Sequence, residues 1–112
     1  MARLPDKLLE HPVVIRPALQ IPASNGAKYG AAVNRMSITN DKATKVTDQR
    51  EDTKGEEVIA SSIVLVQPEH YVRPGSLVTV WPGMPYERTG EVVATSIGKH
   101  SIAWESCRLW IV

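Results

Sequence analysis

The chain has 112 residues, with 13 Lys and Arg against 12 Asp and Glu and a formal net charge of +1. This length allows one domain with a small core. The near-neutral charge gives no support for binding nucleic acid or an anionic membrane by bulk electrostatics. The single cysteine, Cys107, excludes an internal disulfide and a multi-cysteine metal site, and it predicts core packing in a reducing compartment.

No stretch has the roughly 20 apolar residues of a membrane helix. The beginning of the chain also lacks the apolar segment of a signal peptide. We therefore expect no membrane partner and use of the protein in the compartment where it is made.

The N-terminal third predicts a helical turn, a short strand and a loop. Pro5 to Glu10 favours one or two helical turns, because proline suits the first turn and Asp6 lies near the positive end of the helix dipole. The segment Val13 to Arg16 is typical of a strand, and Pro12 and Pro17 on its two sides indicate an edge.

A loop with the turn residues of 22–26 follows, and then comes a weaker strand over residues 31–38. In that strand we expect the even-numbered residues, Ala32, Asn34, Met36 and Ile38, to face inward.

The remaining strands are more distinct. Residues 56–66 are rich in β-branched side chains and predict one strand, which ends at Gln67-Pro68. After a turn over 68–75, residues 76–81 place Val78 and Val80 on one face. Residues 91–97 predict a further strand, and 102–112 one long or two short strands. This spacing indicates an all-β domain over residues 1–112, a small antiparallel β-barrel of six to seven strands, with a sandwich as the alternative.

Residues 40–57 form a charged segment with four basic and six acidic residues and one large apolar side chain, Val46. We expect it to project as a mobile loop, or as a hairpin with its tip near residues 52–55. Long polar loops are uncommon in small domains and are often functional, although a merely solvated loop stays open. Its candidate functional residues are Asp41, Lys42, Lys45, Asp48, Arg50, Glu51, Asp52, Lys54, Glu56 and Glu57.

No motif for catalysis, a metal or a cofactor is present. His11, His70 and His100 are far apart and lack metal-ligand spacing. Cys107 and the serines lie outside nucleophile signatures, and no glycine-rich phosphate loop occurs. Solvent should keep the acidic pairs of the charged segment near their ordinary pKa values, which suits catalysis poorly. We expect no cofactor and no enzyme. A small β-barrel adaptor or an oligonucleotide-binding module stays open, although Trp81, Trp104 and Trp110 fit a core or an interface better than stacking on bases.

The order of these features resembles the head-closure, or stopper, proteins of the head-to-tail connector of long-tailed (siphovirus-type) bacteriophages, particularly those of actinobacterial hosts. The resemblance begins with Leu4–His11 leading directly into the strand Val13–Arg16. It continues through the loop Asn25–Gly30, a strand, the charged segment and the strand Val58–Val64. It ends with Val72–Val80 and covers most of the chain to about residue 97.

The resemblance implies a structural virion protein that is assembled in the host cytoplasm and located at the head–tail junction. Copies of it would form a six- or twelve-fold ring below the portal and adaptor, close the DNA-filled head and dock the tail terminator protein. The charged segment would be the gating loop, which meets packaged DNA in the channel without sequence specificity. A ring also needs apolar contact surfaces. We predict Val13, Ile15, Tyr71, Trp110 and Ile111 as interface residues.

Overall fold

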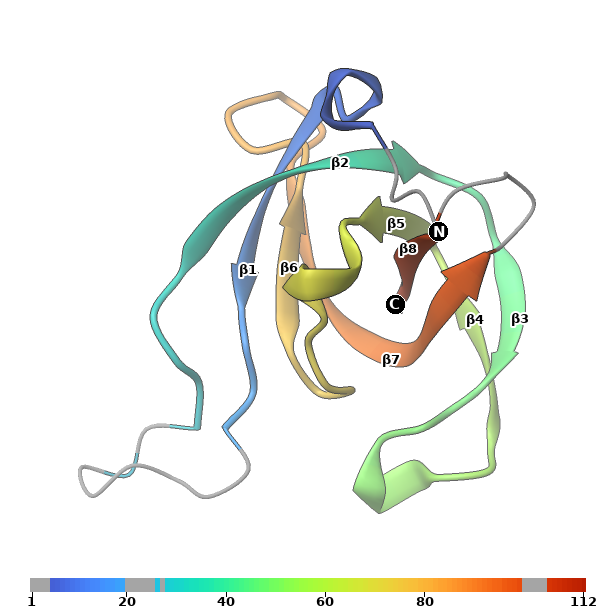
Figure 1. Ribbon diagram of the computed structural model, residues 1–112. Coiled ribbons are helices and arrows are strands. Elements are labelled where there is room, and N and C mark those ends of the chain that lie inside the picture. Colours follow the sequence, from blue (N-terminus) through green and yellow to red (C-terminus); the bar gives the residue numbers. More distant parts are fainter. Residues whose placement is uncertain (1–4, 20–25, 27, 100–104) are drawn as a thin grey trace.

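The computed structural model describes residues 5–19, 26, 28–99 and 105–112, and its fold is a closed β-barrel with a two-stranded hairpin attached to it (Figure 1). The strands are β1 (His11–Arg16), β2 (Val33–Asn40), β3 (Thr44–Thr47), β4 (Glu57–Ala60), β5 (Ser62–Val66), β6 (Leu77–Val80), β7 (Arg88–Lys99) and β8 (Glu105–Ile111). Three single 3-10 turns complete the elements: η1 (Asp6–Leu8), η2 (Glu51–Thr53) and η3 (Pro68–His70). The predicted all-β barrel with a short N-terminal helical turn is confirmed.

Six strands close the barrel in the order β1-β2-β5-β8-β7-β6, and neighbouring strands are antiparallel. The expectation that β1 forms an edge is wrong, because β1 pairs with β2 on one side and with β6 on the other. Pro12 and Pro17 lie at the ends of this strand, where fewer ladder hydrogen bonds require an N–H group. Closure of the barrel removes the edge that the sequence indicated.

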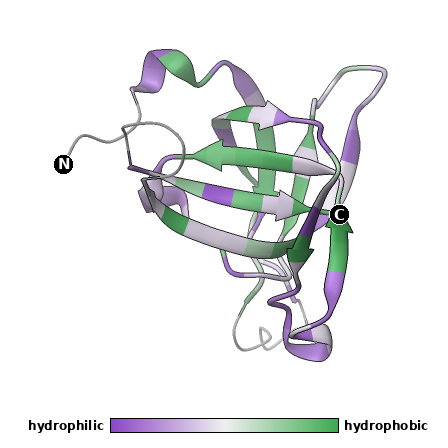
Figure 2. Ribbon diagram, turned by 90° about the vertical axis from the view of Figure 1, so that its right-hand side faces the viewer, coloured by the Kyte–Doolittle hydropathy of each residue, from purple (hydrophilic) through white to green (hydrophobic). Residues whose placement is uncertain are grey.

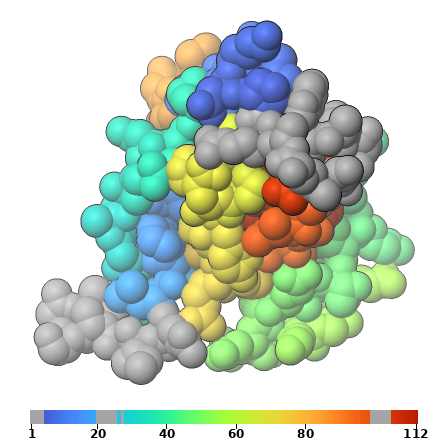
Figure 3. Space-filling view, in the orientation of Figure 1, coloured from blue at the N-terminus to red at the C-terminus, as the bar shows by residue number. Residues whose placement is uncertain are grey.

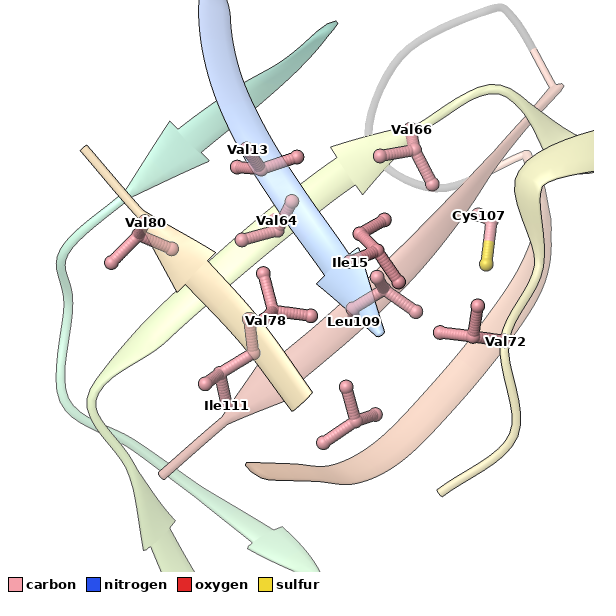
Figure 4. Packing of buried hydrophobic residues seen from close by; sticks show 11 residues of the cluster. Val13, Ile15, Val64, Val66, Val72, Val78, Val80, Cys107, Leu109 and Ile111 are labelled. Atoms are coloured by element: carbon pink, nitrogen blue, oxygen red, sulfur yellow. The ribbon is translucent and has the colours of Figure 1, made fainter. Parts of the chain in front are cut away.

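The core fills the inside of the barrel with side chains from every wall strand except β2. Figure 4 shows these residues pointing toward one another; the cluster consists of Val13, Ile15, Val64, Val66, Val72, Val78, Val80, Val92, Cys107, Leu109 and Ile111. The predicted alternation along β6 is present, and the face with Val78 and Val80 is the buried one. Burial raises the pKa of Cys107 to about 11, which fits the predicted packing role.

The predicted inward face of β2 is wrong. Ser37 and Thr39 are buried, whereas Met36 is 46% exposed. The two hydroxyl groups hydrogen-bond each other at 2.7 Å, and Ser37 Oγ also donates to the His11 carbonyl oxygen at 2.9 Å. Thr39 N donates to His11 Nδ1 at 3.0 Å. These bonds satisfy polar groups at the barrel wall, so the polar residues face inward although the alternating apolar residues predicted the opposite.

The segment predicted as one strand over residues 56–66 is two strands that separate at Ser61. β5 stays in the barrel wall, where Ser61 N donates to the Ile111 carbonyl oxygen at 2.7 Å. β4 leaves the wall and pairs with β3 alone. We call residues 44–60, which comprise β3, η2 and β4, the arm. Figure 2 shows its strongly hydrophilic turn below the barrel.

One end of the barrel is covered by a 3-10 turn (Figure 1). η3 lies across one end in the view of Figure 1, and the following residue Val72 joins the core. Residues 102–104 of the predicted C-terminal strand and His100 lie outside the described residues. Within the described part of the chain, no helix has the length and apolar character needed to cross a membrane.

Candidate functional site: the arm and its two anchor clusters

The arm leaves the barrel at an irregularity in strand pairing. Asn40 pairs with Ile63 at the end of β2, and Thr44 pairs with Ala60 at the start of the arm. Residues 41–43 therefore lie opposite residues 61 and 62 only, so one side of the hairpin has an extra residue. Such a bulge bends a strand pair and increases its twist, which directs the arm away from the barrel wall.

A polar cluster, which we call the root cluster, holds the arm at this bend. The Asp41 carboxylate accepts hydrogen bonds from Ser62 Oγ at 2.5 Å, Trp81 Nε1 at 2.7 Å and Arg88 Nη2 at 3.1 Å. Arg88 also donates to Ser61 Oγ at 2.8 Å and to Ser62 Oγ. Burial raises the pKa of Asp41, but the bonds from Ser62, Trp81 and Arg88 outweigh it and lower the pKa overall. Through Asp41, the cluster thus joins the segment that leads into the arm to β5, β7 and the residue that follows β6.

Trp81 reaches this cluster through an unusual backbone conformation. Its φ of 54° makes it the one described non-glycine residue in the left-handed region. Its indole ring lies 4.8 Å from His11 and 5.7 Å from Tyr86, centroid to centroid. A bulky residue held there costs about 1 kcal/mol or more, and such strain concentrates at functional positions. In this backbone conformation the indole N–H points toward Asp41 and donates to its carboxylate.

A second group of charges, which we call the tip cluster, holds the turn of the arm. Asp48 is 1% exposed, and its carboxylate accepts bonds from Arg50 N, Nε and Nη2 at 2.8, 3.0 and 2.7 Å. Thr53 Oγ1 donates to the same carboxylate at 2.6 Å. The other Arg50 branch bridges to Glu91 on β7 at 3.1 Å. Arg50 therefore links the turn of the arm to the barrel wall.

These bonds explain the electrostatics of the tip cluster. The hydrogen bonds from Arg50 lower the pKa of Asp48 far below its ordinary value, although desolvation opposes the shift, and Thr53 adds to it. The pKa of Arg50 is raised by the same bonds with Asp48 and by those with Glu91, again against the cost of burial. Both groups stay charged at neutral pH.

Gln49 attaches the arm directly to the backbone of β7. Its main-chain N–H donates to the carbonyl oxygen of Val93 at 2.7 Å. Its side-chain amide bonds Thr95 in both directions, accepting from Thr95 N at 3.1 Å and donating to Thr95 O at 3.4 Å. β7 carries a bulge between Val92 and Ala94, which leaves Val93 out of the ladder with β8.

The two faces of the arm differ. Thr44, Val46 and Val58 are half-buried, and Ala60 is fully buried. The opposite face is exposed and carries Lys45, Thr47, Glu57 and Ile59. Lys45 and Glu57 form an ion pair of 3.4 Å there with side chains 66% and 68% exposed, so the pair contributes little to stability. One face of the arm thus rests on the molecule, and the other is exposed and of mixed polarity.

The structure separates the predicted gating residues into three groups. Asp41 belongs to the root cluster, and Asp48 and Arg50 belong to the tip cluster. The others are exposed along the arm and its flank: Lys42, Lys45, Glu51, Asp52, Lys54, Glu56 and Glu57. The predicted hairpin is present, but its turn is anchored and not free. Asp48 does not project into solvent with the rest of the segment: it is buried, and Arg50 and Thr53 satisfy its carboxylate.

The predicted interface residues divide as well. Val13, Ile15 and Ile111 are at most 2% exposed, so their assignment to an interface is wrong. They point into the closed barrel, where alternation along the strands puts them. Tyr71 is 46% exposed, and Trp110 is half-buried with the Arg108 guanidinium 5.7 Å from its ring centroid. For Tyr71 and Trp110, the assignment to an interface stays a prediction.

Several residues that hold the arm in place escaped sequence reasoning, namely Gln49, Ser62, Trp81, Arg88 and Glu91. The nearest sequence signal is the pair Asp48 and Arg50, two residues apart at the end of a strand. Comparison with protein families, with curated proteins and with solved structures finds no match to the chain. The residues and their geometry therefore carry the functional argument.

Acid should release the tip of the arm. Because the pKa of Asp48 is lowered in the folded chain, its ionised form stabilises docking. That stabilisation is fully present above the ordinary carboxyl pKa of about 4 and is lost as the pH falls toward the lowered value. We expect protection of the Gln49 amide against hydrogen exchange, corrected for intrinsic rates, to fall between about pH 5 and about pH 2.

Asp48→Asn provides the control for this titration. It removes the titrating group but keeps an acceptor for Thr53, so protection of the Gln49 amide should be low near neutral pH. Any pH dependence that remains in this variant does not come from Asp48. Protection in the unaltered chain that stays constant down to about pH 2 would show that the Asp48 charge does not hold the arm.

Proposed function

We propose that the chain is a structural subunit of the head–tail connector of a long-tailed bacteriophage. In this role, copies form a ring below the portal and adaptor, close the DNA-filled head and dock the tail. The main observation that supports this proposal is a polar hairpin, which is inserted between two neighbouring barrel strands, β2 and β5, and bends away from the wall at its root. The barrel supplies a rigid ring element, and the arm supplies an element that can meet the channel.

The composition of the arm supports a role beside DNA. The predicted gating segment, residues 40–57, carries six acidic against four basic residues. A surface with excess basic charge would bind phosphates tightly and hold DNA in place at ejection. A slightly acidic obstacle avoids this, and it blocks the passage by its position alone.

The anchors of the arm support a gate with two positions. Between the root and tip clusters, the arm contacts the rest of the molecule through one narrow, half-buried face of β3 and β4. Polar anchors of this kind can exchange for equivalent bonds to a neighbouring subunit, whereas a large apolar contact would hold the arm permanently. We propose the docked arm as one position and an arm turned toward the channel as the other.

Particles assembled without the chain test the assignment. They should contain heads that package DNA and then lose it, and tails should stay unattached, because both tasks need the ring. Electron microscopy counts tailed particles, and nuclease protection measures the DNA kept in heads. Restoring the chain in trans should recover both properties. Normal tailed, DNA-filled particles without the chain would refute the connector function.

A further inference from the structure

β7 extends beyond its partner β6 and leaves one edge open. β6 pairs with β7 only from Arg88 to Glu91, whereas β8 pairs with β7 as far as Lys99. In the described part of the chain, no strand pairs with the β6-facing edge of β7 beyond Val92. An unpaired strand edge presents N–H and C=O groups that can pair with another chain.

The hydrogen bonds around β8 identify which residues face this edge. Ser61 N bonds to Ile111 O, so Ile111 faces β5, and Val112 N bonds to Glu91 O, so Val112 faces β7. By alternation, the even-numbered residues of β8 bond to β7 and lie opposite the even-numbered residues 94–98. The N–H and C=O groups of Thr95 and Ile97 therefore point outward along the open edge.

Gln49 occupies the first half of this edge. Its main chain bonds Val93 O at 2.7 Å, and its side-chain amide bonds Thr95 N and O at 3.1 and 3.4 Å. The amide thus takes the place of a residue in a neighbouring strand. Ile97 follows directly beyond it and is 54% exposed. The Gln49 side chain thus satisfies the backbone groups of the edge at Thr95, whereas the edge stays open at Ile97.

We propose that the edge of β7 at Thr95–Ile97 pairs with the same edge of a second copy, and that Gln49 keeps it closed in the free chain. An antiparallel edge is its own complement, because two copies related by a two-fold axis exchange identical N–H and C=O groups. In this pairing, which is centred on Ser96, each exposed Ile97 lies opposite Thr95 of the other copy.

The charges beside the edge agree with a two-fold contact. Gln49, Glu51, Tyr71, Arg73 and Pro74 line a shallow depression next to it. Figure 3 shows the surface on which the arm's green turn approaches the segment after η3. Glu51 and Arg73 lie 4.0 Å apart, with the Glu51 side chain 91% exposed, so their bond is weak within one chain. A two-fold contact that placed Glu51 opposite Arg73 of the other copy would give each of them a further opposite charge.

Closing the edge also has a consequence that rests on the proposed function. A two-fold contact produces a closed dimer, whereas a ring needs contacts between different surfaces of neighbouring copies. Copies that paired through β7 would be withdrawn from ring assembly. Gln49 therefore keeps free subunits single until the connector is assembled.

The test compares Gln49→Ala with the unaltered chain by sedimentation from about 10 µM to about 1 mM. The unaltered chain should stay monomeric or associate weakly. The variant should form dimers with a dissociation constant at least about tenfold lower, because each copy no longer gives up two amide bonds to pair. Thr47→Ala, on the exposed face of the arm, should behave as the unaltered chain does. Adding Ile97→Lys to Gln49→Ala should abolish the gain, because a charged edge opposes pairing.

Hydrogen exchange on the unaltered monomer keeps the proposal falsifiable if Gln49→Ala does not fold. The Ile97 amide should exchange fast, and the Thr95 amide should be protected by Gln49. An Ile97 amide protected as strongly as that of Ser96, which faces β8, would overturn the open edge. A folded Gln49→Ala that associates no more than the unaltered chain would overturn the pairing. Particle assembly unaffected by dimerising variants would remove only the consequence for the ring.

Discussion

Particles built with a chain in which a glycine link replaces Gln49–Lys54 should fail to retain packaged DNA. The deletion removes the turn of the arm, with Arg50 and Thr53, and leaves β3 and β4 joined by a short link. Asp48→Asn should accompany it, because Asp48 would otherwise be a buried carboxylate without its cation. The barrel should stay folded, since shortening a loop outside the core changes stability little. Nuclease-protected DNA per particle is the measurement.

The control for this deletion keeps the length of the arm. Lys45→Ala combined with Glu57→Ala removes the exposed ion pair but no anchor, so particles should retain DNA as unaltered ones do. If the shortened arm also retains DNA normally, the arm is only a solvated loop. The gating role would then be abandoned, even if the connector function survives the experiment on particles that lack the chain.

Replacing Gly90 by alanine should destabilise the barrel more than other small changes in its wall. Gly90 is buried in β7, opposite Val78. An added Cβ would overlap the Val112 carbonyl oxygen and lie 2.5 Å from Ile111 Cγ2. Backbone cannot give way as a flexible side chain does, so the end of β8 must shift. We expect a loss of about 3 kcal/mol in the free energy of unfolding.

Chemical denaturation monitored by circular dichroism measures this loss. Gly30→Ala is the matched control, because its nearest contact would be Pro17 Cγ at 3.2 Å, which a small shift relieves. That variant should change the free energy of unfolding by less than about 1 kcal/mol. A Gly90→Ala chain as stable as the control would show that the C-terminal end of β8 contributes little to closing the barrel.

The barrel could be predicted because strand patterns are local. The alternation of Val78 and Val80 with Leu77 and Thr79 identifies a strand with two distinct faces without reference to the rest of the chain. Turn residues separate such strands at regular distances, and a small all-β domain has few ways to protect its edges. The same signals predicted six to seven strands, and six strands close the barrel.

The predictions failed where the position of a residue depends on pairing with residues that are far away in the sequence. His11 bonds Ser37 and Thr39 from another strand, which reverses the inward face of β2. The split at Ser61 depends on Ile111, 50 residues away, which holds β5 in the wall while β4 leaves it. Val13 and Ile15 were predicted at an edge, but barrel closure turned them into core residues. A local pattern does not contain these pairings.

The candidate site was predictable as a segment but not as a mechanism of attachment. Unusual length and polarity singled out residues 40–57. Asp48 and Arg50 are near each other in sequence, but Glu91 lies 41 residues beyond Arg50. The same holds for Trp81, whose bond to Asp41 spans 40 residues and depends on a left-handed backbone that sequence favours only for glycine.

Electron cryo-microscopy of intact particles tests the connector function most directly. We expect a ring of six or twelve copies of the six-stranded barrel between the portal and adaptor on one side and the tail terminator on the other. The arm of each copy should face the channel or the neighbouring arms. Particles whose head–tail junction is fully resolved and contains no copy of this barrel would contradict the connector function.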